Sequence, residues 1–532
     1  MIRIGLLARI IFPLLLISTT SAQNQPHGDD VWVKDIMGSR QELKEYFDRM
    51  RKLPETETSY RLLFEAWSKM QPLPYSRDGL PLISPQTLHP DEPTWRNIAR
   101  WAHSPAHDDI YDLIAKAGEG EKDEDDEVRV KLAFGLPYGE EGLPVEYLDA
   151  DFIAEDSPIQ VLGANGFPYI DDLEDLRVLV FAEAYRRGEE DDVYGSCKLL
   201  LDWIRIGRQL ADRDFEIEKV YGMWTMIEST KIMRNILYRH QSSMKVDQYR
   251  EIVDGLNGLF LDRIHFPAGD KRMLLSLVGD TFIHRGGPDT DKFIDAFAKI
   301  ESSDSPLATF QIARRWRGIA QNHAGYFDTV DAIKRIWGDW EFRWNMIDPY
   351  DESIKGPTYF AKLSSADYQS YAIAVFTLGS LENLDHMRKI LVYSIGGTEA
   401  SLGVLAYIEA NKKMPLNFVN ITPRHINRIP TDPYDDREQR NKRQLQYFVP
   451  VRDYPHVGPR ELPTPYTVQL HSPSGADPAV QFNDAGKYDD FLIYSKGKNL
   501  RNDFLREDDE NTGDIMIWPP LEELLRSRGL WP

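Results

Sequence analysis

The residues of this 532-residue chain whose types best suit chemistry lie in an acidic loop near its C-terminal end. The loop contains Asn499, Asn502, Asp503, Asp508, Asp509, Glu510, Asn511 and Asp514. Calcium takes six to eight oxygen ligands, so a carboxylate-rich loop anchored at both ends suits it. The spacing is not that of an EF-hand. On chemistry alone we expect Asp508 and Asp509 to be ligands of an ion that folds the loop rather than one that catalyses. The alternative is a solvated acidic loop.

A second candidate metal pair is His103 and His107, which are four residues apart and are followed by Asp108. Two histidines at this spacing can share a metal from one helix face. However, Pro105 lies between them and predicts a helix break or start, which spoils that geometry. The pattern therefore favours surface or capping roles for both histidines.

No motif identifies a hydrolytic site. The chain has no Gly-x-Ser-x-Gly, no His-Glu-x-x-His and no phosphate-binding Gly-x-x-x-x-Gly-Lys-Ser/Thr sequence. Its 85 acidic residues leave room for a catalytic carboxylate pair without indicating which residues form it. Trp337, Trp340 and Trp344 fall on one helix face and could stack on sugar rings if exposed, but the pattern favours core packing.

Helices must position whatever site exists in the first three quarters of the chain. Apolar residues recur at helical spacing from about residue 39 to residue 410. The clearest stripes are Leu173, Leu176, Val180 and Ala184, then Leu199, Leu200, Trp203, Ile206 and Leu210, then Met273, Leu274 and Leu277. Strand-like alternation is hard to find in this region, so we predict a multi-helix assembly without a regular repeat.

Beyond about Lys412 prolines become frequent and the helical stripes end. Short apolar segments at residues 445–451, 466–470 and 491–494 predict strands. A final helix is expected over residues 521–526, directly after Pro519-Pro520. The composition thus predicts a small α+β module with long loops.

Four segments of this module follow one another in a familiar order. They are a helix at residues 398–411, the turn Pro430-Thr431-Asp432-Pro433, the run Tyr494-Ser495-Lys496-Gly497, and Asp514-Ile515. This order resembles the C-terminal half of type II secretion major pseudopilins, where the last loop holds calcium. The resemblance implies a small α+β fold and a calcium ion held by Asn499 and Asp514.

The chain also departs from that family. Asn499-Leu500 stands where pseudopilins have an Asp-Gly pair, and Lys496 and Lys498 bring cations near the expected site. Nearly 400 residues precede the matching helix, whereas pseudopilins begin with an apolar assembly helix. Pilus assembly by the usual route is therefore not expected.

The N-terminus predicts secretion. Two arginines, Arg3 and Arg9, precede a short apolar run, and small residues follow up to Ala22, which is the pattern of a cleavable signal peptide. We expect no integral membrane span in the mature chain. The only cysteine, Cys197, excludes a disulfide within the chain, and its leucine neighbours predict a buried side chain.

The sequence therefore predicts a mainly α protein with a signal peptide (residues 1–22), a multi-helix domain (23–397) and an α+β module (398–532). The net charge of −22 disfavours nucleic acid and, taken over the whole chain, anionic membrane surfaces. The leading hypothesis is a secreted or periplasmic non-catalytic scaffold or binding protein. Its partner would be an extracytoplasmic protein or a glycan, and calcium would order its tail. The alternative is a secreted helical hydrolase that acts on cell-surface or imported polysaccharide. An enzyme should show a cleft on which two carboxylates of raised pKa converge, and a scaffold should show a broad exposed apolar patch.

Overall fold

The computed structural model describes residues 29–531, apart from 75–87, 121–130, 164, 241–242, 284–285, 305–308, 347–355, 367, 436–442, 451, 454–465, 470–478, 483–490, 503–504 and 506–512. The expected signal peptide, residues 1–22, lies outside the described residues.

The fold is mainly helical, as the sequence predicts, with a small antiparallel sheet near the C-terminus. The helices are α1 (Asp29–Arg51), α2 (Tyr60–Lys69), α3 (Trp95–Ala102), α4 (Asp108–Glu119), α5 (Val145–Asp149), α6 (Pro158–Leu162), α7 (Tyr169–Glu189), α8 (Val193–Ala211), α9 (Glu216–Arg239), α10 (Val246–Asn257), α11 (Gly269–Thr281), α12 (Thr290–Asp304), α13 (Thr309–Asn322), α14 (Tyr326–Asn345), α15 (Tyr359–Ala366), α16 (Ala372–Leu378), α17 (Leu381–Asn411) and α19 (Leu521–Ser527). The strands are β1 (Gln446–Phe448), β2 (Tyr466–Gln469), β3 (Ala479–Phe482), β4 (Leu492–Ser495) and β5 (Ile515–Trp518).

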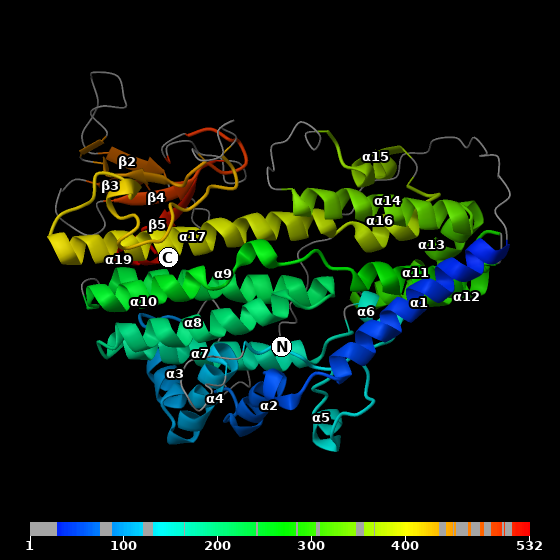
Figure 1. Ribbon diagram of the computed structural model, residues 1–532, viewed down its shortest axis with the longest axis horizontal. Helices are drawn as coiled ribbons and strands as arrows, with labels where there is room; N and C mark the ends of the chain where they lie inside the picture. The colour runs from blue at the N-terminus through cyan, green and yellow to red at the C-terminus, as the bar shows by residue number, and fades with distance from the viewer. Residues whose placement is uncertain are drawn as a thin grey trace.

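The long helices lie nearly parallel to the long axis of the molecule and stack in layers (Figure 1). Helix α8 packs on α7 and α9, and α17 packs on α9 and α10. Helix α1 runs obliquely along α11, and the strands lie over the C-terminal half of α17. The apolar stripes predicted from sequence face this interior, because each of their residues in α7, α8 and α11 is buried. Cys197 is also buried.

Helices α8 and α9 form a tight antiparallel hairpin because glycines face each other across it. A Cβ atom added to Gly222 would lie 2.5 Å from the backbone nitrogen of Ala211 and from the carbonyl oxygen of Gly207. One added to Gly207 would lie 2.9 Å from the carbonyl oxygen of Gly222. Only glycine permits this backbone contact, so the two helices are fixed as one rigid unit.

The tryptophan stripe of α14 belongs to the core. Trp337, Trp340 and Trp344 are all buried, as the sequence favours, and Phe266 packs against two of the three rings with centroids 5.1 and 5.5 Å apart. The Trp344 indole nitrogen donates a hydrogen bond to the carbonyl oxygen of Ile264 (2.8 Å). This face is therefore not available to stack on sugar rings.

The C-terminal strands form two small sheets. In the first, β4 lies between β1 and β5, with Tyr447 opposite Ile493 and Ser495 opposite Ile515. In the second, β2 pairs with β3. The predicted strands at residues 445–451, 466–470 and 491–494 and the final helix are all confirmed, while β3 and β5 are additional.

Helix α17 is longer than the sequence predicts. The helix expected at residues 398–411 begins at Leu381 and runs for 31 residues, so the expected border between residues 397 and 398 lies in its middle. Gly397 lets α17 approach the sheet closely, since a Cβ atom there would lie 2.4 Å from Cγ2 of Ile517. The ring of Trp518 also packs edge-on against Tyr238 of α9, with centroids 5.7 Å apart.

Among the described residues, one helical stretch is long and apolar enough to cross a membrane by length and composition, Ala372–Asn411. Because 72% of its most apolar window is buried inside the protein, its environment fits that of a core helix.

Candidate functional site

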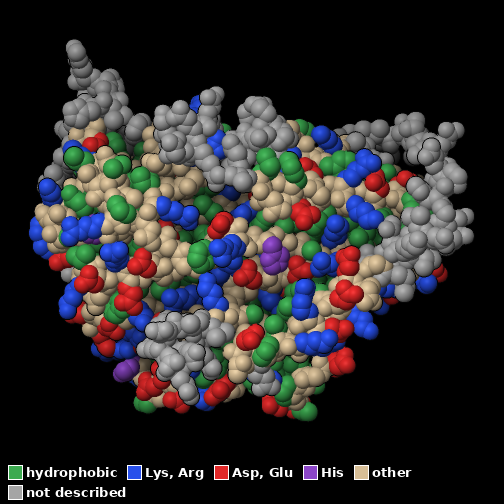
Figure 2. Space-filling view, in the orientation of Figure 1, with side chains coloured by type: hydrophobic (Ala, Val, Ile, Leu, Met, Phe, Trp, Pro, Cys, Tyr) green, Lys and Arg blue, Asp and Glu red, His purple; other side chains and the backbone are tan. Residues whose placement is uncertain are grey.

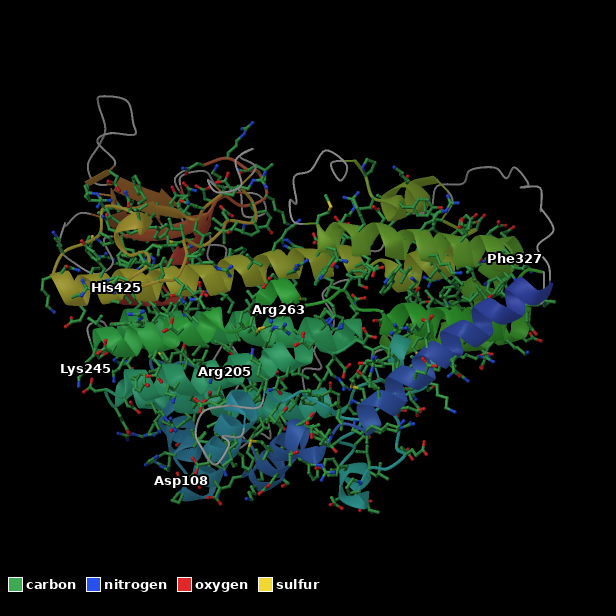
Figure 3. The ribbon with its side chains drawn as sticks, viewed as in Figure 1. Asp108, Arg205, Lys245, Arg263, Phe327 and His425 are labelled. Atoms are coloured by element: carbon green, nitrogen blue, oxygen red, sulfur yellow. The ribbon has the colours of Figure 1, made fainter. Side chains whose placement is uncertain are left out.

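A polar cavity of about 370 Å³ opens where the start of α4 meets the end of α7. Its lining residues are His103, Asp108, Tyr111, Asp112, Glu183, Arg186, Arg187, Glu190 and Asp192. We call it the α4–α7 cavity. Asp108, the first residue of α4, lines the cavity and is labelled in Figure 3.

Local structure explains how these side chains come together. His103 caps the C-terminal end of α3, and the short turn at residues 105–107 leads into α4, which begins at Asp108 and carries Asp112 one turn later. Asp192 caps α8 by accepting a hydrogen bond from the backbone nitrogen of Gly195 (2.9 Å). Four helix ends therefore meet at the cavity, those of α3, α4, α7 and α8, and each supplies a polar residue to its lining.

Glu183 is the centre of the site. It lies on the buried face of α7, and both of its oxygens are occupied. Arg186 donates to it through Nε (2.6 Å) and Nη2 (2.8 Å), and Arg187 donates through Nε (2.8 Å). Arg186 also donates to Glu190 (2.6 Å). Because one buried carboxylate holds two guanidinium groups, their positions are fixed before any ligand arrives.

The remaining groups give the cavity an excess of acceptors. Five carboxylates line it against two guanidinium groups and one imidazole. Asp108 and Asp112 are exposed, and the described structure gives neither an ion pair. Burial raises the pKa of Tyr111, whose hydroxyl donates to the carbonyl oxygen of Ala102 (2.7 Å). The guanidinium of Arg187 lies over its ring, 5.4 Å from the centroid. The cavity thus combines fixed donors, free acceptors and an aromatic ring.

The carboxyl groups with the clearest pKa shifts on α7 lie elsewhere. Burial, together with neighbouring carboxylates, raises the pKa of Asp172 to about 8 and that of Asp175 to about 6. Asp172 precedes Glu183 by three helical turns, which corresponds to roughly 16 Å along α7. These two groups therefore do not converge on the α4–α7 cavity.

A second hollow of about 460 Å³ lies between α14 and α15. Most of its charges are paired within α14, since Arg335 binds Asp331 (2.8 Å) and Arg343 binds Asp339 (3.1 Å). Asp339 also accepts a hydrogen bond from the backbone nitrogen of Tyr359 (2.7 Å), the first residue of α15. These contacts hold the two helices together, so we assign them a structural role.

The expected calcium ligands are only partly described. Asn499 lies in the turn after β4 and Asp514 directly precedes β5, so the two lie at opposite ends of one loop. Each accepts a hydrogen bond from a backbone nitrogen of that loop, Asn499 from Arg501 and Asp514 from Leu505 (both 2.9 Å). Within the described ranges no group of three or more His, Cys, Asp or Glu side chains is placed to hold a metal.

The other two expected ligands, Asp508 and Asp509, lie outside the described residues. Two side chains cannot supply the six to eight oxygens that calcium takes.

Two of the motifs that carry the pseudopilin resemblance are in contact. Asp432 is buried and accepts hydrogen bonds from the hydroxyl of Ser495 (2.7 Å), the backbone nitrogen of Lys496 (2.9 Å) and the backbone nitrogen of Tyr434 (3.0 Å). Lys496 also points its ammonium at Asp435 (3.3 Å). The Asp-Pro turn at residues 430–433 and the Tyr-Ser segment at residues 494–497 are therefore joined by hydrogen bonds.

The structure separates His103 from His107. His107 is buried, and its Nε2 accepts a hydrogen bond from the backbone nitrogen of Gln71 (3.0 Å), while His103 faces the cavity. The helix break at Pro105 is confirmed. His103 is the C-cap residue of α3 and His107 is the N-cap residue of α4, although the buried side chain of His107 makes no capping hydrogen bond.

No family model, curated protein or solved structure matches this chain. The α4–α7 cavity therefore has to be interpreted from its own residues. Sequence analysis missed Glu183, Arg186 and Arg187, although one signal was present. Glu183 falls seven residues after Leu176 and three after Val180, which places a carboxylate on a predicted buried stripe.

Proposed function

We propose that the protein is a secreted, non-catalytic binding protein that holds part of a glycan in the α4–α7 cavity. The observation that carries this proposal is the pair of arginines, Arg186 and Arg187, that Glu183 fixes in place. They line the same cavity as the carboxylates of Asp108 and Asp112, for which the described part of the chain shows no ion pair. Carboxylates only accept hydrogen bonds and guanidinium groups only donate them. A hydroxyl does both, so a ligand rich in hydroxyls can satisfy both kinds of group at once.

Binding is favoured over catalysis because the best-placed carboxylate in the cavity is already occupied. Both oxygens of Glu183 are engaged by guanidinium groups at 2.6 to 2.8 Å. A general acid or base needs an oxygen within reach of the substrate. Glu183 can therefore orient its neighbours but is poorly placed to exchange a proton with a ligand.

The alternative function, a helical hydrolase acting on polysaccharide, is favoured by Asp172 and Asp175. They lie one turn apart on α7 and their pKa values are raised to about 8 and about 6. Two carboxyl groups whose environments separate their pKa values can act as acid and base. This alternative would move the site to the opposite end of α7.

The test is titration calorimetry of the purified mature chain against soluble oligosaccharides. A charge-assisted hydrogen bond contributes about 1.5–3 kcal/mol, so Asp112→Ala should weaken glycan binding at least about ten-fold. Asp109→Ala is the matched control, since this exposed neighbour in α4 does not line the cavity. Equal affinity in both variants, or no binding by any glycan, would overturn the proposal. Release of reducing ends that Asp172→Asn abolishes would support the hydrolase instead.

We also propose, from the pseudopilin resemblance and the acidic composition, that calcium orders the loop between Asn499 and Asp514. Ligand at a hundred times its Kd stabilises a folded protein by about 2.7 kcal/mol. The mature chain should therefore melt at a higher temperature in calcium than in chelator, and Asp514→Ala should abolish the difference. Identical melting curves in calcium and chelator would rule out the ion site.

A further inference from the structure

The segment that links α17 to the C-terminal sheets has an unusual charge for this protein. Residues 412–428 contain Lys412, Lys413, Arg424 and Arg428, and residues 410–431 contain no aspartate or glutamate. The whole chain, by contrast, has 85 acidic against 63 basic residues. We call residues 412–428 the α17 tip.

Two apolar side chains protrude from this tip. Leu416 is 69% exposed and Val419 is 66% exposed. Among the described large hydrophobic residues, only Val145 is as exposed, at 66%. Val145 is the first residue of α5, which also contains Glu146 and Asp149, so it lies in acidic surroundings. The α17 tip is therefore the place in the described structure where strongly exposed aliphatic side chains accompany an excess of cations.

The tip is held in a defined shape, so this exposure is built into the fold. Asn420 accepts hydrogen bonds from the backbone nitrogens of Leu416 (3.0 Å) and Asn417 (3.2 Å). Arg452 donates to the carbonyl oxygen of Pro415 (2.8 Å). Phe418 lies between the two protruding residues and is buried, which anchors the tip and turns its neighbours outwards.

Cations from a second helix extend the basic surface. Lys245 and Arg250 of α10 are exposed, and Lys245 lies at the same end of the molecule as His425 of the tip (Figure 3). Burial and then the charges of Arg424 and Arg250 lower the pKa of His425, which indicates that both arginines are close to it. Figure 2 shows Lys and Arg side chains gathered at this end of the molecule. The acids Glu409 and Asp254 bind Lys412 (2.8 Å) and Arg250 (4.0 Å) and offset only part of the charge.

We propose that the α17 tip docks the protein peripherally on an anionic phospholipid surface. Leu416 and Val419 enter the interfacial layer, and the surrounding lysines and arginines bind the phosphate headgroups. A stable protein–protein interface buries about 800 Å² on each partner, which two protruding side chains do not provide. A lipid surface needs only a few inserted apolar groups together with several cations. The tip therefore fits a membrane surface better than a protein, although the chain as a whole is acidic.

The experiment is flotation of the purified mature chain with two kinds of vesicle. One is made of phosphatidylcholine alone, and in the other roughly a third of the lipid (about 30 mol%) is the anionic lipid phosphatidylglycerol. We expect binding to the anionic vesicles, little binding to phosphatidylcholine, and weakening in high salt because screening reduces the attraction. The double variant Leu416→Glu/Val419→Glu should lose at least about ten-fold in affinity. Lys413→Glu/Arg424→Glu should lose a similar amount, at about five-fold per charge removed.

Val145→Glu is the matched control, because this residue is as exposed as Val419 but lies elsewhere. It should float like the unmodified protein, and all variants should keep the melting temperature of the parent. Failure of the unmodified protein to float with anionic vesicles would overturn the proposal. Equal binding of anionic vesicles by the tip variants and the unmodified protein would also overturn it. If soluble polyglutamate binds the tip while vesicles do not, the surface recognises an acidic protein instead. None of these outcomes depends on glycan binding in the α4–α7 cavity.

Discussion

Two buried arginines, one in the turn that precedes α9 and one within α9, have different surroundings. Arg213 lies at the corner between α8 and α9, where it binds the buried carboxylate of Glu218 (2.8 Å). Arg234 lies at the seam between α9 and α17, where its recorded hydrogen bonds go to uncharged groups. The corner between α8 and α9 is therefore stabilised by a buried ion pair, whereas the seam between α9 and α17 contains a buried arginine whose hydrogen bonds, among the described residues, go to uncharged groups.

At the corner, every oxygen of Glu218 is used. Tyr138 and Tyr169 each donate a hydroxyl hydrogen bond to it (both 2.6 Å), and Arg213 completes the set. Burial alone would lower the pKa of Arg213, but the charge of Glu218 and the neighbouring tyrosines outweigh it and the pKa is raised. The guanidinium also lies over the ring of Tyr138, 4.2 Å from the centroid. The ion pair and its hydrogen bonds offset the cost of desolvation.

At the seam, the desolvation cost is not offset. Arg234 donates to the hydroxyl of Thr398 (2.6 Å) and to the carbonyl oxygen of Ser394 (3.1 Å), and burial lowers its pKa to about 10. Glu399, the next residue of α17, is also buried, and burial raises its pKa to about 7 despite the opposing charge of Arg428. The contribution of the seam residues to the free energy of unfolding should therefore depend on pH more than the contribution of the corner residues.

Glu218→Ala should have the largest effect, because it leaves Arg213 charged and buried without a partner. Removing one member of a buried ion pair costs about 3–5 kcal/mol. Urea denaturation of the mature chain measures the loss. Glu218→Gln keeps the side-chain volume and one acceptor and should cost less. A cost below about 1 kcal/mol for the alanine variant would show that the corner does not depend on the pair.

Gly397→Leu should disturb the contact between α17 and the sheet by crowding, because a Cβ atom there would lie 2.4 Å from Ile517 of β5. Overpacking of this kind costs about 1–3 kcal/mol. Gly318→Leu is the control, since a Cβ atom on this α13 glycine meets nothing within 4 Å. The control should be neutral or slightly stabilising, because leucine forms helix more readily than glycine. Equal melting temperatures for the two variants would contradict a close α17–sheet contact.

Glu399→Gln should change how the free energy of unfolding depends on pH, by about 3 kcal/mol between low and high pH. The pKa of Glu399 is raised from 4.5 to about 7 on folding, so the native state binds its proton more tightly than the unfolded state. Stability from this residue is present below pH 4.5 and is lost as pH rises through 7. The glutamine variant, which mimics the neutral form, should match the parent at low pH and exceed it above pH 7. If the free energies of unfolding of the parent and the glutamine variant differed by the same amount at every pH from 4 to 8, the raised pKa of Glu399 would be contradicted.

Arg234→Met should have the smallest effect, within about 1 kcal/mol of the parent at pH 7. The substitution removes a buried charge that has no carboxylate partner, and it keeps most of the apolar stem. Ser394 and Thr398 are not left without hydrogen bonds, because Thr398 also donates to the carbonyl of Ser394 (2.7 Å) and Ser394 contacts Thr230 (2.9 Å). Arg213→Met in the same assay gives the comparison. Equal losses for the two arginines would remove the distinction between corner and seam.

Much of the fold could be predicted because it depends on local patterns. The stripe of Leu173, Leu176 and Val180 required a helix, since residues three and four apart share a helix face. The crowding of prolines after Lys412 required the long helices to end. By contrast, β5 was missed because Ile515–Trp518 is only four residues long and becomes a strand by pairing with β4.

The site depended on contacts between segments far apart in the chain. The sequence determined that Asp108 would begin a helix after Pro105 and that Glu183 would fall on a buried face. It did not determine that these residues would line one cavity, because α4 and α7 are about fifty residues apart in the chain and meet only through packing. In the same way, composition fixed the number of arginines, whereas the tertiary structure decided that Arg213 binds a carboxylate and that Arg234 donates its hydrogen bonds, within the described residues, to uncharged groups. Periodicity is a property of neighbouring residues, and charge pairing in a core depends on which helices pack together.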